Sequence, residues 1–302
     1  MSTINDTHCH FFSSRFLELL APERGGAAAA AAWLGWDAPG TARNLADRWV
    51  AELDRNGVGR AALIASIPGD ESSVAEALDA HPSRFVGFAM HNPAAPDAAA
   101  ALTRAFAELH VRTVCLFPAM HGYRLDDPCV DRVFRIAAAN GGAVFAHCGV
   151  LTVGVRRKLG LPSRFDLRLG DPLTLSRVAL AFPLVPVIIP HFGAGFLREA
   201  LIAADQCASI HLDTSSSNSW IRFHPGLSLD AVFRQALSVA GADRVIFGTD
   251  SSFFPRGWQR DIYEAQRTLL EKLGVSDADR DKIFAGNFDR LFPSSAPSQG
   301  DV

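Results

Sequence analysis

The sequence predicts an α/β protein, a (β/α)₈ TIM barrel with extra C-terminal helices. Short β-rich segments alternate with longer helical patterns through almost the whole chain, which is typical of βα units around a parallel sheet. Several of the strand segments are nearly all apolar, as expected for strands that are covered on both faces. With 302 residues, 48% of them hydrophobic, the chain is long enough to form such a barrel as one domain.

Eight strand candidates follow one another along the chain, each with a helical stretch after it. They are Ile4–His8, Arg60–Ser66, Phe85–Met90, Val111–Phe117, Ala143–His147, Pro186–Pro190, Ser209–Asp213 and Arg244–Gly248. The period of the apolar residues predicts the connecting helices, with one face formed by Leu45, Trp49, Leu53 and Asn56 and another by Val130, Val133, Phe134 and Ala137. We expect the barrel domain to span residues 1–293 and the polar tail, residues 294–302, to be disordered.

Two connections are unusually long. Residues 22–41 contain an alanine run, and residues 149–171 contain four arginines. In a barrel, the loops after strands one and five lie on the face that carries the active site, so both are candidates for a lid or a substrate loop. A short extra helix without a chemical role is the alternative for the alanine run.

Charge and composition limit the partners of the protein. The net charge is −3, from 29 basic and 32 acidic residues without a run of one sign, which argues against binding to nucleic acid or an anionic membrane. No leader pattern and no apolar run of about 18 residues is visible, so we expect a cytoplasmic protein. The five cysteines lack paired spacing and are expected to be reduced. A small molecule is the expected partner, and a homodimer is left open.

Side chains suited to metal binding stand at the ends of four predicted strands. His8 and His10 are separated by one residue, so both imidazoles face the same side of a strand. His147 ends strand five, His191 ends strand six, and Asp250 follows strand eight. Because the carboxyl ends of barrel strands converge on one mouth, these five side chains are expected to face one another.

The ordered motifs DTHCH, VFAHCG, IIPHFGAG, VIFGTD and IFAGNFDRLF resemble those of the amidohydrolase superfamily. The similarity, over roughly residues 4–292, is to the amidohydrolase-related family that includes aminocarboxymuconate semialdehyde decarboxylase. It implies that His8, His10, His147 and Asp250 bind one divalent metal, with Zn²⁺ as the first candidate and Mn²⁺ as the second. It also implies that His191 is an acid/base, and Asp250 would share its proton transfers. A role for His191 in completing the coordination shell is the alternative.

The chain departs from this family at strand four. Many relatives read Lys-Leu-His-Pro there, and some superfamily members bridge two metals with a carboxylated lysine at this strand, whereas this chain reads Val-Cys-Leu-Phe-Pro over residues 114–118. Its only lysines, Lys158, Lys272 and Lys282, belong to a loop and to the final helices. We therefore predict one metal, and we interpret Cys115 as a core residue in preference to a ligand.

Six further residues are candidate substrate contacts. His121 and Tyr123 follow strand four, where substrate contacts fall in the family, although a turn-stabilising role fits them equally well. Arginines suit bidentate recognition of a carboxylate, and the loop after strand five is rich in them, but they could instead be solvated or paired with Asp166 and Asp171. These arginines are Arg156, Arg157, Arg164 and Arg168.

The leading functional hypothesis is a metal-dependent hydrolase. A bound cation would activate a water molecule for attack on an amide, lactone or related bond in a small, carboxylated substrate. Nonoxidative decarboxylation of an aromatic or enol carboxylate is the first alternative. A metal-free lactonase or a non-catalytic barrel is the second.

Overall fold

The strands of the barrel follow chain order. The computed structural model describes residues 3–215 and 220–294, and within them eight parallel strands form one sheet in the order β1 to β8. Their bounds are β1 Ile4–Phe11, β2 Val58–Ala65, β3 Phe85–His91, β4 Val111–Leu116, β5 Ala143–Ala146, β6 Val187–Ile189, β7 Ile210–Asp213 and β8 Val245–Ile246. The first and last strands approach one another through a bridge between Cys9 and Ser251 and a hydrogen bond from the His10 amide to the Ser251 carbonyl, 2.7 Å long. The sheet is therefore a nearly closed barrel, as predicted.

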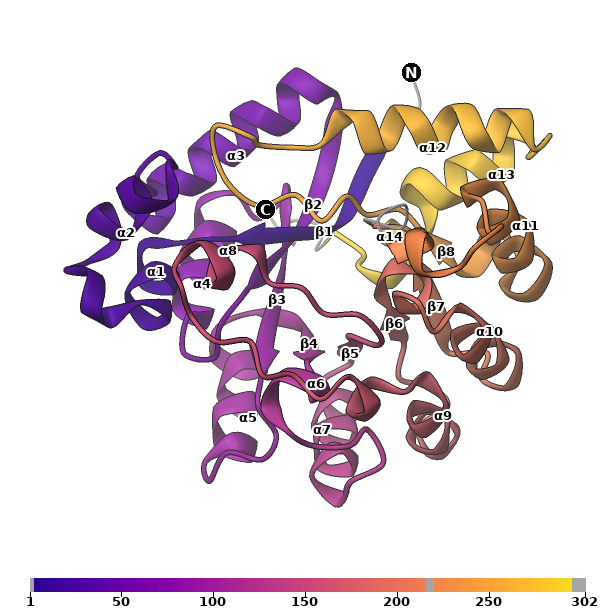
Figure 1. Ribbon diagram of the computed structural model, residues 1–302, viewed down its shortest axis with the longest axis horizontal. Coiled ribbons are helices and arrows are strands. Elements are labelled where there is room, and N and C mark those ends of the chain that lie inside the picture. The colour runs from indigo at the N-terminus through magenta and orange to yellow at the C-terminus, as the bar shows by residue number, and fades with distance from the viewer. Residues whose placement is uncertain (1–2, 216–219, 295–302) are drawn as a thin grey trace, which may run out of the picture.

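Helices surround the barrel and cover its outer face (Figure 1). The α-helices are α1 Ser14–Leu20, α2 Ala27–Leu34, α3 Ala42–Asn56, α4 Glu71–Ala80, α5 Ala98–Glu108, α6 Pro118–His121, α7 Pro128–Ala139, α8 Gly154–Lys158, α9 Pro172–Ala181, α10 Leu197–Gln206, α11 Leu229–Ala240, α12 Arg260–Lys272, α13 Asp277–Asp281 and α14 Asn287–Leu291. Shorter 3₁₀ segments are η1 Pro22–Arg24, η2 Leu167–Gly170, η3 Pro190–Gly193, η4 Trp220–Phe223 and η5 Ala242–Arg244, and η6 Lys282–Gly286 is a π-helical turn.

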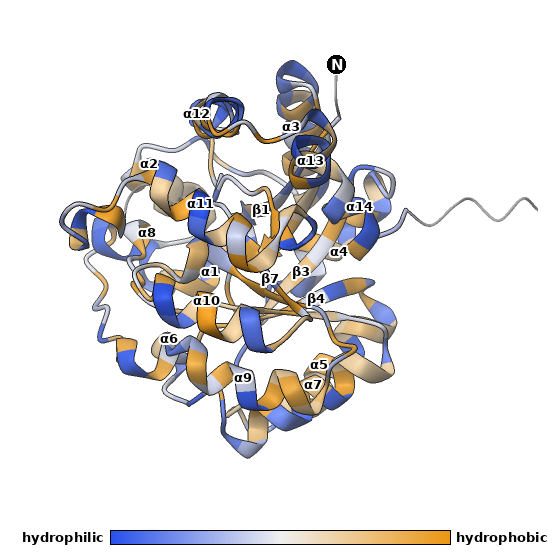
Figure 2. Cartoon of the chain, turned by 90° about the vertical axis from the view of Figure 1, so that its right-hand side faces the viewer, coloured by the Kyte–Doolittle hydropathy of each residue, from blue (hydrophilic) through white to orange (hydrophobic). Residues whose placement is uncertain are grey.

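The alternation of side chains along each strand creates two apolar layers. In β2, Leu63 points into the layer between barrel and helices, whereas Ile64 points into the barrel interior. The strands in the centre of Figure 2 are largely orange, and the surrounding helices carry both blue and orange bands. Cys115 belongs to the interior layer and is fully buried, as expected for a core residue.

The C-terminal helix α14 contributes side chains to the barrel interior. Phe288 of α14 and the following Phe292 are buried in the interior layer, and the Phe292 ring lies 5.3 Å from that of Phe88 on β3. The predicted extra helices therefore contribute to the core. The predicted tail lies almost entirely outside the described residues, which end at residue 294. No helix within the described ranges is long and apolar enough to cross a membrane.

The two long loops pack against each other. The alanine run forms the helix α2, and the loop after β5 forms α8. Leu17 of α1, Leu34 of α2 and Val155 of α8 belong to an apolar cluster that is separate from the two barrel layers. Arg24 donates a hydrogen bond to the Leu159 carbonyl at 3.0 Å and adds a polar contact between the loops. We call this unit of α1, α2 and α8 the lid.

Candidate metal centre and active site

Three side chains converge at the carboxyl end of the barrel. His8 and His10 lie two residues apart in β1, so the strand period turns both rings toward the mouth, and Asp250 follows β8. The Oδ1 atom of Asp250 lies 3.1 Å from the Nε2 of His10 and 3.6 Å from the Nε2 of His8. Ligand atoms of the three residues all lie within 4.8 Å of one another, a spacing that could hold a metal ion.

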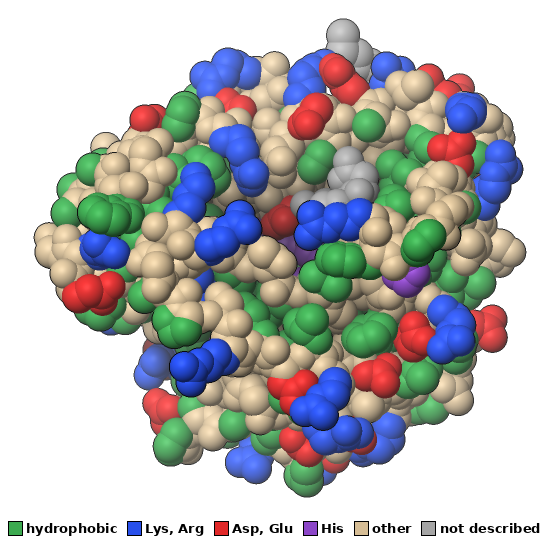
Figure 3. Space-filling view, viewed as in Figure 1, with side chains coloured by type: hydrophobic (Ala, Val, Ile, Leu, Met, Phe, Trp, Pro, Cys, Tyr) green, Lys and Arg blue, Asp and Glu red, His purple; other side chains and the backbone are tan. Residues whose placement is uncertain are grey.

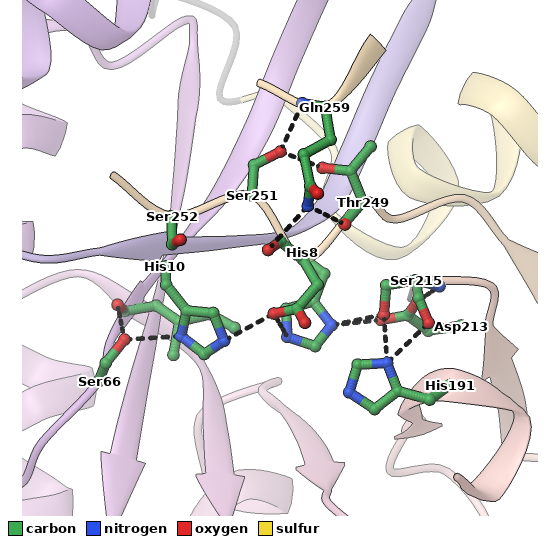
Figure 4. Close-up of polar contacts among 12 residues, drawn as sticks. His8, His10, Ser66, His191, Asp213, Ser215, Thr249, Ser251, Ser252 and Gln259 are labelled. Atoms are coloured by element: carbon green, nitrogen blue, oxygen red, sulfur yellow. Dashed lines mark hydrogen bonds and ion pairs between the residues drawn. The ribbon is translucent and has the colours of Figure 1, made fainter. Parts of the chain in front are cut away.

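The remaining ring nitrogens of both histidines are held by hydrogen bonds (Figure 4). The Nδ1 of His8 lies 2.9 Å from Asp213 Oδ2 and 2.8 Å from Ser215 Oγ. The Nδ1 of His10 lies 2.7 Å from Ser66 Oγ, and that hydroxyl donates its own proton to the Ile64 carbonyl at 3.0 Å. Ser66 must therefore accept a proton from His10, just as Asp213 must accept one from His8. Both Nε2 atoms are left as acceptors, the form in which imidazole binds a metal.

His191 lies beside this cluster with a defined tautomer. It follows β6 in η3, and its ring centroid is 5.1 Å from that of His8. Its Nδ1 donates to the Ser215 carbonyl at 2.7 Å, because a carbonyl oxygen can only accept. The Ser215 hydroxyl lies 3.0 Å from the same nitrogen. The Nε2 of His191 is therefore free to accept a proton when the ring is neutral.

His147 lines the same cavity but stands apart from the close cluster. It follows β5, its ring stacks on Phe117 with centroids 5.1 Å apart, and its centroid is 5.3 Å from that of His191. Within the described ranges its ring nitrogens make no hydrogen bond to another residue. The structure thus joins His8, His10 and Asp250 most closely, with His147 and His191 on the wall next to them.

The backbone is strained where these residues stand. His191 has a φ of 57° and Asp250 a φ of 58°, in the left-handed region that residues other than glycine rarely adopt. Phe192 and Ala194 in the same turn have φ values of 50° and 44°. Such strain tends to gather at functional sites, where the surrounding structure must maintain it.

Close packing of two loops helps to maintain this turn. A side chain at Gly149, two residues beyond His147, would meet the Gly193 carbonyl at 2.2 Å, so only glycine fits there. The amide of Val150 donates to the Ala194 carbonyl at 2.7 Å. The loops that follow β5 and β6 are therefore joined directly beyond their histidines.

Burial and nearby charge set the proton affinities of the cluster. Burial opposes protonation of His8, but the charge of Asp213 and its hydrogen bond outweigh burial and raise the pKa. Burial would raise the pKa of Asp250, yet the contact with the His10 ring and the positive charges that His8 and His10 carry when protonated hold it below its usual range. Burial and the charge of His8 lower the pKa of His191. Burial, with the charge of His191, places the pKa of His147 well below its ordinary value. The site therefore holds an anionic carboxylate beside neutral His147 and His191 rings.

A cavity of about 510 Å³ opens above these residues. In Figure 3 a hollow near the centre has His and acidic side chains at its floor, and Lys and Arg side chains flank its opening. Most of its wall is apolar and includes Phe12, Trp36, Phe117 and Phe253, and three basic side chains also line it. A volume of this order and an apolar wall with a few polar groups are typical of small-molecule sites.

The candidate substrate residues lie elsewhere. Of the described residues that line the cavity, none is His121, Tyr123, Arg156, Arg157, Arg164 or Arg168. Tyr123 is buried in the outer layer, and the ring of His121 stacks beside it. Arg168 pairs with Asp166 at 2.7 Å, as expected if this arginine is paired within its own loop and does not bind substrate. Arg156 donates to the Pro162 carbonyl at 2.7 Å.

The basic residues that do line the cavity had no predicted role. They are Lys158 of α8, Arg222 of η4 and Arg256 beyond β8. Lys158 has no expected role as a loop residue, but the loop after β5 folds back over the mouth and carries it to the cavity. Asp213, Ser215 and Ser66 were also missed as partners of the histidines. Asp213 could have been found, because it ends an apolar strand as His147 does.

Comparisons with known proteins identify the family and support the fold. A family model described as amidohydrolase matches residues 6–293. Among curated proteins, none matches the chain by sequence. Solved structures resemble it along almost the whole length.

Three of these solved structures hold a bound metal or are named for a reaction. A 5-carboxyvanillate decarboxylase of Novosphingobium aromaticivorans, complexed with manganese and a nitrobenzoic acid, is 16% identical, with 96% of each chain covered and a TM-score of 0.65. A zinc-bound amidohydrolase of Burkholderia multivorans is 16% identical, with 97% of this chain and 100% of that chain covered and a TM-score of 0.66. A putative 2-pyrone-4,6-dicarboxylic acid hydrolase of Pseudomonas putida is 18% identical, with 98% and 100% covered and a TM-score of 0.61.

Proposed function

Because the chain belongs to the amidohydrolase family, we propose that it is a metal-dependent enzyme that hydrolyses an amide, lactone or related bond in a small carboxylated substrate. The observation that carries the proposal is the convergence of two histidine Nε2 atoms on one Asp250 oxygen, with both Nδ1 atoms held from behind. Carboxylates or hydroxyls in this outer position fix the ring and raise its basicity toward a metal. This arrangement is more typical of a metal site than of side chains that only stabilise the fold.

The donor set fits one divalent ion. We propose that His8, His10 and Asp250 hold it and that His147 completes the set. Nitrogen and oxygen ligands suit Zn²⁺ first and Mn²⁺ second. The zinc of the Burkholderia amidohydrolase and the manganese of the Novosphingobium decarboxylase accord with this order of candidates without deciding between them. When bound, such an ion supplies Lewis-acid chemistry and makes a water molecule nucleophilic near neutral pH.

We assign the proton transfers to His191. Its Nδ1 proton is engaged by Ser215, so the lone pair of Nε2 is available to remove a proton from the attacking water and to return it to the leaving group. Its lowered pKa keeps this ring neutral at pH 7. Asp250 remains ionised and orients the reacting groups in the same space.

Nonoxidative decarboxylation is the second candidate. The apolar wall of the cavity favours it. An apolar environment destabilises a bound carboxylate anion relative to the neutral CO₂ that decarboxylation releases. In this reaction the Nε2 of His191 would first take up a proton from water and then deliver it to the carbon that loses the carboxyl group. The similarity in fold to a carboxyvanillate decarboxylase accords with this candidate as the similarity to a putative pyrone hydrolase accords with the first.

One experiment tests both candidates. Purified protein is analysed for metal and then assayed with lactones, cyclic amides and carboxylated aromatic compounds, following acid production and CO₂ release separately. About one Zn²⁺ or Mn²⁺ per chain with acid production supports hydrolysis. CO₂ release would replace hydrolysis with decarboxylation. Full activity after complete chelation would contradict the metal-dependent mechanism and favour a metal-free lactonase.

A further inference from the structure

The closest ligand set is divided between two strands that are barely paired with each other. His8 and His10 belong to β1, whereas Asp250 follows β8. Every other pair of neighbouring strands is joined by a ladder, but within the described part of the chain no ladder joins β8 to β1. A single bridge between Cys9 and Ser251 links them instead. The separation of the two histidines from Asp250 therefore depends on other contacts across this junction.

Asp6 of β1 is a fully buried carboxylate that crosses the junction. Its Oδ1 accepts the amide of His8 at 2.8 Å and the amide of Thr249 at 3.1 Å. Its Oδ2 accepts the Thr249 hydroxyl at 2.5 Å and the indole N–H of Trp258 at 2.7 Å. One of these donors thus lies on β1 and three lie in the segment after β8. Both backbone amides are next to the candidate ligands, since His8 is one of them and Thr249 precedes Asp250.

The donors at Asp6 belong to a chain of hydrogen bonds with a single direction. Because the carboxylate accepts from the Thr249 hydroxyl, the Ser251 hydroxyl, 2.6 Å away, must donate to Thr249 in turn. Ser251 Oγ accepts the backbone amide of Gln259 at 2.9 Å (Figure 4). The side-chain amide of Gln259 donates to the carbonyls of Thr249 and Asp250 at 2.9 and 3.2 Å. The residues on both sides of Asp250 are therefore held in place.

This network surrounds a strained backbone. The φ of 58° at Asp250 lies in the left-handed region, and such a conformation persists only where the surrounding structure maintains it. Hydrogen bonds to an ionised carboxylate are stronger than those between neutral groups. A buried donor left without its acceptor is costly, so the network favours one position of the turn over its alternatives.

We infer that Asp6 is a positioning residue for the metal centre, which fixes the turn carrying Asp250 against the strand carrying His8 and His10 before any ion binds. The inference rests on the proposed function, because that proposal assigns these three side chains to a metal. Among the described residues, neither the ligand cluster nor the cavity wall includes Asp6, so it acts through the backbone of His8 and Thr249. A preassembled donor set lowers the cost of ordering that accompanies binding.

Zinc affinity, measured by competition with a chromophoric chelator, tests this role. Asp6→Asn keeps the shape of the side chain but replaces one acceptor oxygen with a donor, so two of the four donor groups lose their acceptor. The variant should bind Zn²⁺ about 10- to 100-fold more weakly, the range for changes behind metal ligands. With Co²⁺ in place of Zn²⁺, its visible absorption spectrum should differ from that of the parent, because coordination geometry determines the spectrum.

Asp70→Asn is the matched control. Asp70 is also fully buried and accepts the hydroxyls of Ser13 at 2.7 Å and Ser73 at 2.6 Å, but it lies at the start of α4. This variant should bind Zn²⁺ as the parent does, even where its melting temperature falls. Equal losses of zinc affinity in Asp6→Asn and Asp70→Asn would show a general effect of lower stability and overturn the positioning role.

Two substitutions at Thr249 keep the inference testable if Asp6→Asn does not fold. Thr249→Val has nearly the same shape but lacks the hydroxyl that donates to Asp6, whereas Thr249→Ser retains it. The valine variant should bind Zn²⁺ about tenfold more weakly than the parent, and the serine variant should recover most of that loss. Parent-like zinc affinity in Thr249→Val would overturn the role of the network.

Hydrogen exchange of chelated protein separates this inference from the proposed function. Asp6→Asn should increase amide exchange in residues 248–252, because the turn loses its anchor before any ion is present. If the parent binds no metal and this increase is seen, the proposed function fails and the anchoring of the turn by Asp6 stands. If the parent binds Zn²⁺ and Asp6→Asn changes neither exchange nor affinity, the positioning role alone fails.

Discussion

At the scale of single residues, the site depends on side chains that do not touch the substrate. Asp213 orients His8 through Nδ1, and its other oxygen accepts the Ser215 amide at 2.5 Å. Ser215 then contacts both His8 and His191. One carboxylate at the end of β7 thus positions a candidate metal ligand and, through Ser215, the candidate acid/base.

The first prediction concerns this carboxylate. Asp213→Asn should weaken metal binding by about 10- to 100-fold, because the neutral amide supports the His8 tautomer less well. Affinity is measured by competition with a chromophoric chelator. Asp205→Asn, which changes an exposed carboxylate of α10, is the control and should bind metal as the parent does. Unchanged metal affinity in Asp213→Asn would mean that the contact serves only the fold.

The second prediction concerns His191. His191→Asn should retain the metal and reduce kcat by about 10²- to 10⁴-fold, the range for loss of a general acid/base. Asparagine is chosen because it tolerates the left-handed backbone that His191 adopts. The readouts are metal content and turnover of the substrate found in the screen. A variant that also loses its metal would reassign His191 as a ligand.

At the scale of elements, the strands were predictable and the lid was not. The apolar runs predicted all eight strands, and β1 extends beyond its predicted end to Phe11, so that His10 lies within the strand. The positions of His8, His10, His147, His191 and Asp250 around one mouth follow from barrel geometry, since strand ends converge there. The contacts made by the loops depend on tertiary packing, which no local pattern records.

The loop after β5 shows this limit most clearly. Its arginines were predicted to face the substrate, but the helix α8 turns Gly154, Val155 and Lys158 toward the cavity, since residues three and four apart share a helical face. Arg156 and Arg157 therefore point elsewhere. The sequence shows that this loop is basic. Which of its basic residues faces the cavity depends on α8, a helix of five residues that is too short to predict.

The third prediction concerns the independence of the lid. Leu159 is 2% exposed and packs in the lid cluster rather than in the barrel layers. Leu159→Ala should increase hydrogen exchange and protease cleavage in residues 150–165 while the global unfolding midpoint stays close to that of the parent. Leu53→Ala in α3 is the matched control in the outer layer, and it should lower the global free energy of unfolding by about 2–5 kcal/mol. An equal global loss in both variants would show that lid and barrel unfold together.

At the scale of the whole molecule, we expect stability at acid pH to depend on a buried histidine remote from the metal centre. His211 on β7 is 4% exposed, and its Nδ1 donates to the Ser209 carbonyl at 3.0 Å. Its Nε2 is buried without a hydrogen-bond partner among the described residues. Burial, together with the positive charges of Arg290 and Arg244, lowers its pKa to about 4. Protonation would therefore place an unpaired charge beside two arginines.

The fourth prediction follows from this lowered pKa. An unfolded histidine has a pKa of about 6.5, so the unfolded state binds the proton first as the pH falls, and stability is lost between about pH 6.5 and 4. Urea unfolding should show that the titration of His211 lowers the free energy of unfolding by about 3 kcal/mol across this interval, at 1.36 kcal/mol per pKa unit.

The variant His211→Phe removes this titration. Its free energy of unfolding should therefore fall less steeply toward pH 4 than that of the parent, whatever its value at pH 7.5. His110→Asn, which removes an exposed imidazole, controls for the loss of a histidine as such. Parallel pH profiles for the parent and His211→Phe would show that His211 is protonated at the same pH in both states and that the acid lability arises elsewhere.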